Sequence, residues 1–189
     1  PEFSNHPPMK TFKTSIRNYY ERASAVEKMV PPLYENGKPF VDRALRAFKN
    51  ETWRSDFSFR AEVFVRASTL MKMRRSELAK TIVGESHKTH KEALADVDEA
   101  IDFIDFYIRE EASLQNLSPL AKGVFVVIAP WNFPLAIACG MSCAALISGN
   151  SVILKPSEFT PTIAVIWGDI LKEAGMPPFI FQCALGLGE

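Results

Sequence analysis

The chain has 189 residues, and its 22 Lys and Arg residues balance its 22 Asp and Glu residues, so its formal net charge is zero. A neutral chain has no general electrostatic attraction to nucleic acid or to an anionic membrane. Hydrophobic residues make up 47% and charged residues 23% of the chain. These proportions are typical of globular proteins, argue against intrinsic disorder, and allow about one or two domains.

The three cysteines, Cys139, Cys143 and Cys183, lie in apolar segments and lack the spacing of a disulfide framework. A reducing compartment is therefore favoured. No charged residue lies between Lys122 and Lys155, but prolines and a Gly-Asn pair divide this stretch. Each piece is shorter than the roughly 20 apolar residues of a membrane-spanning helix, so we expect a buried core and no integral membrane span.

Residues 1–50 are mixed in character and contain clusters of proline. We expect a short helix over residues 14–29. At residues 33–38, an Asn-Gly pair predicts a small hairpin or an extended arm. The chain begins with Pro1 rather than Met and ends in a glycine turn. We therefore expect it to be a piece of a longer protein.

Residues 51–118 are expected to form a helical segment. Apolar residues recur at three- and four-residue spacing over residues 58–83, which predicts an amphipathic helix or a helix pair divided near Ser76. The strongest period follows over residues 93–108 and predicts one long helix with an apolar stripe. We interpret the acidic residues of this helix as its solvated face: Asp96, Asp98, Glu99, Asp102 and Asp105.

The character of the chain changes at Gly123 into alternating strands and helices. The first strand is a continuous β-branched and aromatic run, as expected of a central strand covered on both faces. Thr160 is expected to cap the second helix, which begins with Pro161. The predicted strands cover residues 124–129, 151–154 and 180–184, and the predicted helices cover residues 135–147 and 161–174. The fold class is therefore α/β, with N-terminal helices leading into a parallel Rossmann-like βαβαβ unit over residues 119–189.

Ligands of open parallel sheets bind beyond the carboxyl ends of the strands. Three segments fall at that edge: residues 130–134, 155–158 and 186–188. Lys155 can donate to a ribose or phosphate, Glu158 can accept from ribose hydroxyls, and a glycine turn lets the backbone approach a pyrophosphate. Each signal alone is also typical of a tight turn or a solvated charge.

Two segments at this edge resemble signature motifs of the aldehyde dehydrogenase superfamily. They are Gly-Val-Phe-Val-Val-Ile-Ala-Pro-Trp-Asn-Phe-Pro at residues 123–134 and Gly-Asn-Ser-Val-Ile-Leu-Lys-Pro-Ser-Glu at residues 149–158, at the right separation. Residues 99–107 and the Glu189 ending are more similar to the Δ1-pyrroline-5-carboxylate (L-glutamate γ-semialdehyde) dehydrogenase branch. The resemblance covers nearly the whole chain, whereas the chain covers less than half of the family's catalytic unit.

The resemblance implies a catalytic residue and a set of cofactor-binding residues. Asn132 matches the residue whose amide stabilises the oxyanion formed when a cysteine thiolate attacks the aldehyde; its alternative role is to cap the next helix. Lys155 and Glu158, with Ser157 between them, match the ribose-binding positions. An acid at Glu158 disfavours a 2′-phosphate, so the implied cofactor is NAD rather than NADP. The remaining cofactor positions are Ile128, Ala129, Pro130, Trp131 and Gly188, with a plain core role as the alternative for Ile128 and Trp131.

Two further positions match the substrate side of the family site. Glu85 matches a carboxylate that could take the ammonium group of an amino-acid semialdehyde, and Phe133 would form an apolar wall. A solvated charge is the alternative for Glu85, and the family usually has Gly where His87 stands. His87 and His90 lack partner ligands at sensible spacing, so we expect no metal site.

The family's nucleophilic Cys and general-base Glu have no counterpart in these 189 residues, so the chain alone is expected to be inactive. The three cysteines are expected to be core residues instead. The resemblance implies the N-terminal part of an NAD-dependent enzyme of proline catabolism that oxidises L-glutamate γ-semialdehyde to glutamate. Its partner is then a small-molecule aldehyde substrate and no nucleic acid.

The full-length enzyme is expected to be a homo-oligomer in the cytoplasm, or in the mitochondrial matrix of a eukaryote. Two alternatives stay open at this point. One is another semialdehyde or aldehyde dehydrogenase. The other comes from a different class and is a non-catalytic, truncated nucleotide-binding or assembly fragment.

Overall fold

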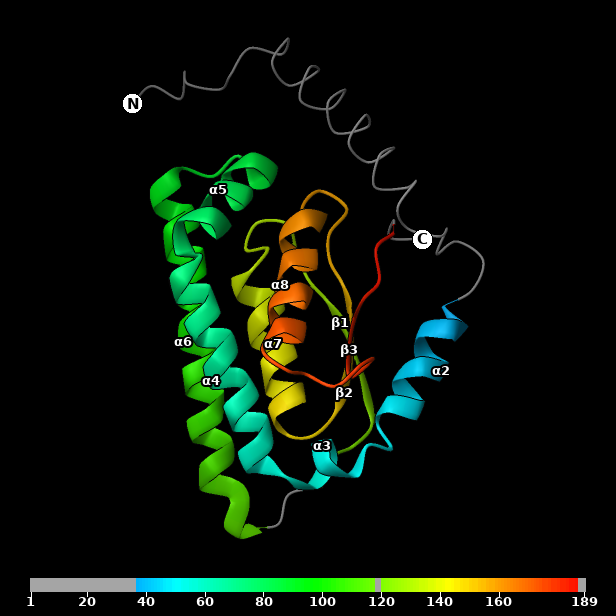
Figure 1. Ribbon diagram of the computed structural model, residues 1–189. Coiled ribbons are helices and arrows are strands. Elements are labelled where there is room, and N and C mark those ends of the chain that lie inside the picture. The colour runs from blue at the N-terminus through cyan, green and yellow to red at the C-terminus, as the bar shows by residue number, and fades with distance from the viewer. Residues whose placement is uncertain (1–36, 118–119, 187–189) are drawn as a thin grey trace, which may run out of the picture. The chain divides into compact units, whose positions relative to one another are not determined.

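The computed structural model describes residues 37–117 and 120–186 and confirms the α/β fold class (Figure 1). A parallel sheet lies in the middle of this part of the chain. Helix α2 (Lys38–Ala47) packs against the strands from one side, and the helices α4 to α8 lie on the other side (Figure 1). The core therefore has its main part between the sheet and these later helices.

The sheet consists of β1 (Val124–Ile128), β2 (Ser151–Lys155) and β3 (Phe181–Cys183), in the order β1-β2-β3. Both neighbouring pairs are parallel, as the sequence predicts. The register places Ile128 opposite Lys155, the last residues of their strands. The carboxyl ends of the strands therefore lie together at one edge of the sheet.

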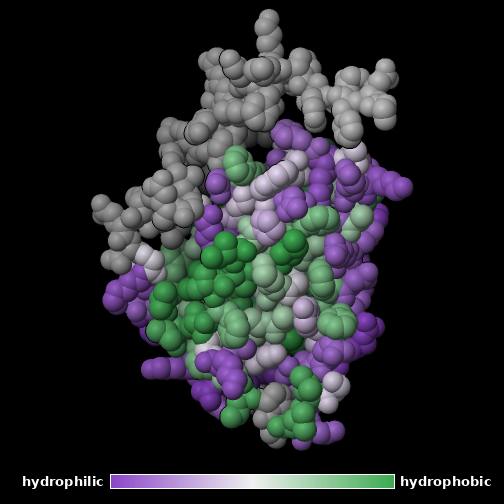
Figure 2. Space-filling view, turned by 180° about the vertical axis from the view of Figure 1, so that it is seen from behind, coloured by the Kyte–Doolittle hydropathy of each residue, from purple (hydrophilic) through white to green (hydrophobic). Residues whose placement is uncertain are grey.

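The buried centre of the described sheet is β2, and the expectation that β1 is covered on both faces is wrong. In β2 every residue before Lys155 is buried, whereas Phe125, Val126 and Ile128 of β1 are exposed. β2 pairs with a strand on each side, while β1 is an edge strand among the described residues. Figure 2 shows a broad apolar area on the back of the molecule.

Helices α7 (Ala136–Ile147) and α8 (Pro161–Glu173) connect the strands at the predicted positions. The small residues of α7 allow close packing: a Cβ atom on Gly140 would lie 3.0 Å from the ring of Phe103. Helix α8 begins with Pro161 as predicted, but the Thr160 hydroxyl makes no capping hydrogen bond. The prediction that Thr160 caps α8 is therefore wrong, and another residue has to serve its first turn.

Three long helices form the outer layer that covers α7 and α8. They are α4 (Phe57–Met73), α5 (Arg75–Ser86) and α6 (His90–Leu114). The predicted helix pair divides at Arg74, close to the expected break. A short 3₁₀ helix, η2 (Gln115–Leu117), follows α6. None of the helices in the described ranges is both long enough and apolar enough to cross a membrane.

The long helix α6 begins at a capping box, in which two residues satisfy each other's backbone groups. Thr89 Oγ1 accepts a hydrogen bond from Glu92 N at 3.3 Å, and a Glu92 carboxylate oxygen accepts from Thr89 N at 2.8 Å. Hydrogen bonds from Thr89 lower the pKa of Glu92. Of the acidic residues assigned to the solvated face of α6, Asp96 is only 1% exposed, so that assignment is wrong for Asp96.

The N-terminal part of the described chain is helical. The sequence predicts a hairpin or extended arm at residues 33–38, but Lys38 begins α2, and residues 33–36 lie outside the described residues, as does the helix expected at 14–29. Gln182 Nε2 of β3 donates to Phe40 O at 3.0 Å and so attaches α2 to the sheet. Helix α3 (Glu51–Ser55) follows, with Asn50 as its N-cap.

A substitution at Gly149 tests the packing between α3 and the turn before β2. Its φ is +83°, and an added Cβ atom would lie 2.9 Å from the carbonyl oxygen of Arg54. We expect Gly149→Ala to lower the free energy of unfolding by about 1–3 kcal/mol, because both the backbone angle and the contact are unfavourable for a side chain. Urea unfolding of the product of the complete reading frame that encodes these residues measures the change.

Gly84→Ala is the matched control for this substitution. Gly84 lies inside α5, and an added Cβ atom there would meet nothing within 4 Å. This second variant should gain about 0.5–1 kcal/mol, because alanine favours the helix. Equal effects of the two substitutions would contradict the described turn at Gly149.

Candidate functional site

Two of the three segments predicted to follow the strands, residues 130–134 and 155–158, lie along one edge of the sheet. Backbone hydrogen bonds continue the pairing beyond the strands: Ala129 N donates to Lys155 O at 3.1 Å, and Ala184 N donates to Leu154 O at 2.7 Å. Residues 130–134 and 155–158 therefore begin as neighbours. Of the third predicted segment, 186–188, the structure describes Gly186, which follows β3, whereas residues 187–189, Gly188 among them, lie outside the described residues.

Lys155 and Glu158 form an ion pair at the end of β2, with Nζ and Oε2 3.5 Å apart. Their side chains are 23% and 31% exposed, so a ligand can reach both. Ser157 is buried, and its Oγ accepts a hydrogen bond from Phe159 N at 3.2 Å, which shapes the turn between them. The edge thus presents a cation and a carboxylate side by side, suited to the hydroxyl groups of a ribose.

The residues that follow β1 include exposed aromatic and apolar side chains. Ile128 is 71% and Trp131 is 52% exposed among the described residues. Ala129 is buried, and Pro130 is half-buried. A flat ligand can therefore contact apolar surface beside the Lys155–Glu158 pair.

Asn132 is exposed in the bend between β1 and α7. The alternative that it caps α7 is wrong, because Leu135 occupies the N-cap position and no side chain of the bend caps the helix from there. The group that serves the first turn of α7 comes from another helix: Asp96 Oδ1 accepts a hydrogen bond from Ala136 N at 2.7 Å. The amide of Asn132 is therefore not used for capping.

Asp96 also forms a buried ion pair with Lys88. Lys88 Nζ lies 2.8 Å from Asp96 Oδ2, and the two side chains are 15% and 0% exposed. The same Nζ atom lies 3.7 Å from the centre of the Phe133 ring, a cation–π contact. The cluster is absent from the predictions made from the sequence. The spacing carries a signal for it, because Asp96 falls three residues after Ala93 and four before Ala100, on the apolar stripe of α6.

Glu85, and not Thr160, accepts the hydrogen bonds of the first turn of α8. Its Oε1 accepts from Thr162 N at 2.6 Å, and its Oε2 accepts from Ile163 N at 3.0 Å. The interpretation of Glu85 as a merely solvated charge is therefore wrong. The proposed contact between Glu85 and a substrate stays a prediction.

The turn after Glu85 has the backbone that the family's usual glycine would favour. His87 has a φ of 58°, in the left-handed region, where it ends α5. Glycine adopts such angles without a steric cost, and histidine does so less readily. The local turn is therefore kept in spite of the histidine.

Cys139 and Cys143 lie in the core, as predicted, whereas Cys183 is the half-buried last residue of β3. Cys139 and Cys143 are buried in α7 with their sulfur atoms 3.6 Å apart. Burial raises the pKa of the Cys143 thiol and raises that of half-buried Cys183 to about 12. A thiol with a raised pKa is a poor nucleophile at neutral pH. Within residues 37–117 and 120–186, no group of three His, Cys, Asp or Glu residues could hold a metal ion.

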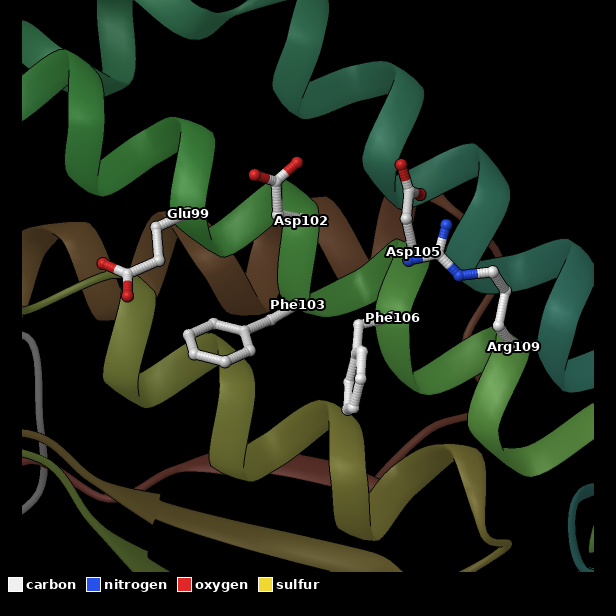
Figure 3. A pocket seen from close by; sticks show the side chains of 6 residues that line it. All are labelled: Glu99, Asp102, Phe103, Asp105, Phe106 and Arg109. Carbon is white, nitrogen blue, oxygen red and sulfur yellow. The ribbon is translucent and has the colours of Figure 1, made fainter.

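The hollow shown in Figure 3 is separate from this edge. It lies along α6, where the rings of Phe103 and Phe106 point toward α7 and Glu99, Asp102 and Arg109 lie along its rim. None of the predicted site residues lines it. The candidate site therefore remains at the carboxyl ends of the strands.

A parallel βαβαβ unit with an accessible Lys-Glu pair at its strand ends is typical of the α/β domains that bind a ligand beyond the carboxyl ends of their strands. The comparison with known families agrees with this class and narrows it. Residues 34–189 match the aldehyde dehydrogenase family, and the chain belongs to that family.

Several relatives share the segment that this chain represents. The 1-pyrroline-5-carboxylate dehydrogenases of Bacillus cereus (strain ATCC 10987 / NRS 248) and Bacillus mycoides (strain KBAB4) are 35% and 38% identical to it over 194 residues. These matches include 95% of this chain and 37% of each relative. The chain therefore spans little more than a third of the length of these curated relatives.

Solved structures of the same family resemble this fold. The 1-pyrroline-5-carboxylate dehydrogenase from Thermus with bound NAD is 37% identical, with a TM-score of 0.73 over 79% of this chain and 31% of that chain. Proline utilization A from Bdellovibrio bacteriovorus, inactivated by N-propargylglycine, is 35% identical, with a TM-score of 0.74 over 79% of this chain and 17% of that chain.

The reactivity of the three thiols tests their described burial. We expect Cys143 and Cys183 to resist iodoacetamide at pH 8 in the native protein, because burial raises the pKa of both thiols. We expect Cys139 to resist it because its side chain is fully buried in α7. Peptide mapping by mass spectrometry after timed labelling measures the modification of each residue. The same protein unfolded in urea is the control, and all three residues should be labelled there. Native labelling of Cys143 at the rate seen in urea would contradict the described burial.

Proposed function

We propose that this chain provides the N-terminal part of an NAD-dependent dehydrogenase that oxidises L-glutamate γ-semialdehyde to glutamate. The observation that carries the proposal is the meeting of the Asn132 bend and the Lys155–Glu158 pair at one edge of the sheet. Membership of the aldehyde dehydrogenase family and relatives named 1-pyrroline-5-carboxylate dehydrogenase support it. A solved relative with bound NAD supports the choice of cofactor.

The adenosine ribose of NAD would lie against the end of β2. Lys155 donates to its hydroxyl oxygens and Glu158 accepts from its hydroxyl hydrogens, while Ser157 holds the turn between the two. Ile128, Ala129, Pro130 and Trp131 would line the neighbouring wall, and Gly188 would approach the pyrophosphate. The carboxylate of Glu158 repels a 2′-phosphate, which makes NAD the preferred cofactor over NADP.

Asn132 would act on the reacting carbonyl group. NAD, when bound, accepts the hydride in this reaction. The nucleophilic thiolate and the general base come from outside these residues. When the thiolate adds to the aldehyde carbon, the carbonyl oxygen becomes an oxyanion, and the amide N–H of Asn132 donates to it. Because this hydrogen bond strengthens as charge develops, Asn132 lowers the barrier more than it strengthens substrate binding.

Glu85 and Phe133 would contact the remainder of the substrate. Phe133 is 39% exposed and offers an apolar wall for the methylene groups of the semialdehyde. The carboxylate of Glu85 is the group that would accept from the substrate's ammonium group. We place the complete enzyme in the cytoplasm as a homo-oligomer.

A direct assay tests the proposed reaction. The product of the complete reading frame should form NADH from NAD and L-glutamate γ-semialdehyde, with a higher kcat/KM than with succinate semialdehyde. A higher kcat/KM with succinate semialdehyde would contradict the proposed substrate and favour the alternative of another semialdehyde dehydrogenase. Binding of NAD without turnover of any aldehyde would favour the non-catalytic alternative.

Asn132→Ala tests the oxyanion role. The substitution should lower kcat by a factor of about 10²–10³, since one lost oxyanion donor costs about 2.7–4 kcal/mol. The dissociation constant for NAD should change little, because the amide acts on the substrate oxygen. Asn116→Ala, at an exposed position after α6, is the matched control and should leave kcat unchanged. An equal kcat in the two variants would overturn the role of Asn132.

Glu158→Ser tests the preference between the two cofactors. Removing the carboxylate removes its repulsion of the 2′-phosphate, so the ratio of kcat/KM for NADP to that for NAD should rise by about tenfold, the effect of roughly 1.4 kcal/mol. Steady-state kinetics with both cofactors measure this ratio. Glu99→Ser, which removes an exposed carboxylate from α6, should leave the ratio unchanged. An unchanged ratio in Glu158→Ser would contradict the placement of the ribose.

A further inference from the structure

The bend that carries Asn132 has to be held in place, because an oxyanion donor works only when its position is fixed before the reaction. Asn132 itself is exposed, and the bend has no regular secondary structure until α7 begins at Ala136. Its position therefore depends on what holds the residues on either side of the amide.

Two charged side chains from outside the bend hold it at two points. At its end, Asp96 Oδ1 accepts from Ala136 N at 2.7 Å. In its middle, Lys88 Nζ lies 3.7 Å from the centre of the Phe133 ring, and Phe133 directly follows Asn132. Lys88 and Asp96 bind each other at 2.8 Å, so the two points belong to one cluster.

The burial of this cluster makes it stiff. Asp96 is 0% and Lys88 only 15% exposed at the side chain, so neither charge can turn to water without breaking the pair. Losing one partner would leave the other charge buried and uncompensated, which is strongly unfavourable. A cation–π contact is also stronger when the cation has lost its water. Lys88 therefore has few alternatives to its place beneath Phe133.

We infer that Lys88 is a positioning residue for Asn132: through Asp96 and Phe133 it fixes the bend that presents the oxyanion donor. This inference rests on the proposed function. Lys88 does not touch the reacting atoms. Its ammonium group holds the ring that follows Asn132 and neutralises the carboxylate that binds the first turn of α7.

A purely stabilising ion pair would give a different result from a positioning one. Loss of a stabilising pair lowers the unfolding temperature and leaves the chemistry of the folded molecules intact. Loss of a positioning pair also slows hydride transfer in molecules that are folded and saturated with NAD. The rate of chemistry in the folded, cofactor-bound protein is therefore the measurement that separates the two.

The experiment compares Lys88→Met with Lys72→Met in the product of the complete reading frame. Lys72 is the matched control, because its ion pair with Asp105 is longer, at 3.5 Å, and the two side chains are 57% and 44% exposed. Three quantities are measured for each protein: the single-turnover rate of NADH formation, the dissociation constant for NAD, and the midpoint of thermal unfolding. Assays are run well below that midpoint.

In Lys88→Met the single-turnover rate should fall by about tenfold to a hundredfold, the effect of a small misplacement of a catalytic group. The NAD dissociation constant should stay within about twofold, since Lys155 and Glu158 are untouched. Lys72→Met should match the wild-type protein in both. If Lys88→Met does not fold, Lys88→Gln keeps a donor for Asp96 and removes the cation, and the same fall in rate is expected.

A single-turnover rate in folded Lys88→Met or Lys88→Gln equal to the wild-type rate would overturn the inference. An equal fall in Lys72→Met would also overturn it, because the effect would then follow from any lost lysine. If the wild-type protein shows no aldehyde oxidation, the proposed function fails and this inference fails with it. If the wild-type protein is active and the Lys88 variants react at the same rate, the inference fails while the proposed function stands.

Discussion

The rest of this structure depends on how the first turns of two helices are satisfied. The first N–H groups of a helix have no partner within the helix, and α7 and α8 both begin at the edge of the sheet where the site lies. Two carboxylates from residues 85–96, the end of α5 and the start of α6, meet this need: Asp96 binds Ala136 N, and Glu85 binds the backbone of Thr162 and Ile163. We call this segment, residues 85–96, the α5–α6 corner. It determines where both ligand-facing loops end.

This arrangement explains why the edge differs from a glycine-rich phosphate loop. A helix N-terminus is a ready site for an anionic group, and in many dinucleotide-binding domains the pyrophosphate occupies it. Here the chain's own carboxylates hold both N-termini, so a dinucleotide must rely on other groups. Among the described residues, we propose partly exposed Lys155 and Glu158 for this contact, with the exposed Trp131 following the neighbouring strand.

The positions of the strands and helices could be predicted from the sequence, but the side-chain contacts between these elements could not. Apolar runs, a Pro at the start of α8 and glycines after the helices predict the strands and helices, because these signals act over a few residues. The roles of Asp96 and Glu85 depend on partners 40 and 77 residues away, which no local period reveals. For the same reason the sequence predicts that Thr160 caps α8, whereas Glu85 makes the capping hydrogen bonds. The exposure of β1 likewise follows from strand order and not from its own composition.

The most direct test of this account is the stability of Asp96→Ala beside that of Asp102→Ala, which removes an exposed carboxylate from the same helix. Urea unfolding of the product of the complete reading frame measures both. The account predicts a loss of about 3–5 kcal/mol for Asp96→Ala, because Lys88 is left buried without a partner. Asp102→Ala should stay within about 0.5 kcal/mol of the wild-type protein. Equal, small losses in the two variants would contradict the claim that the α5–α6 corner holds the site.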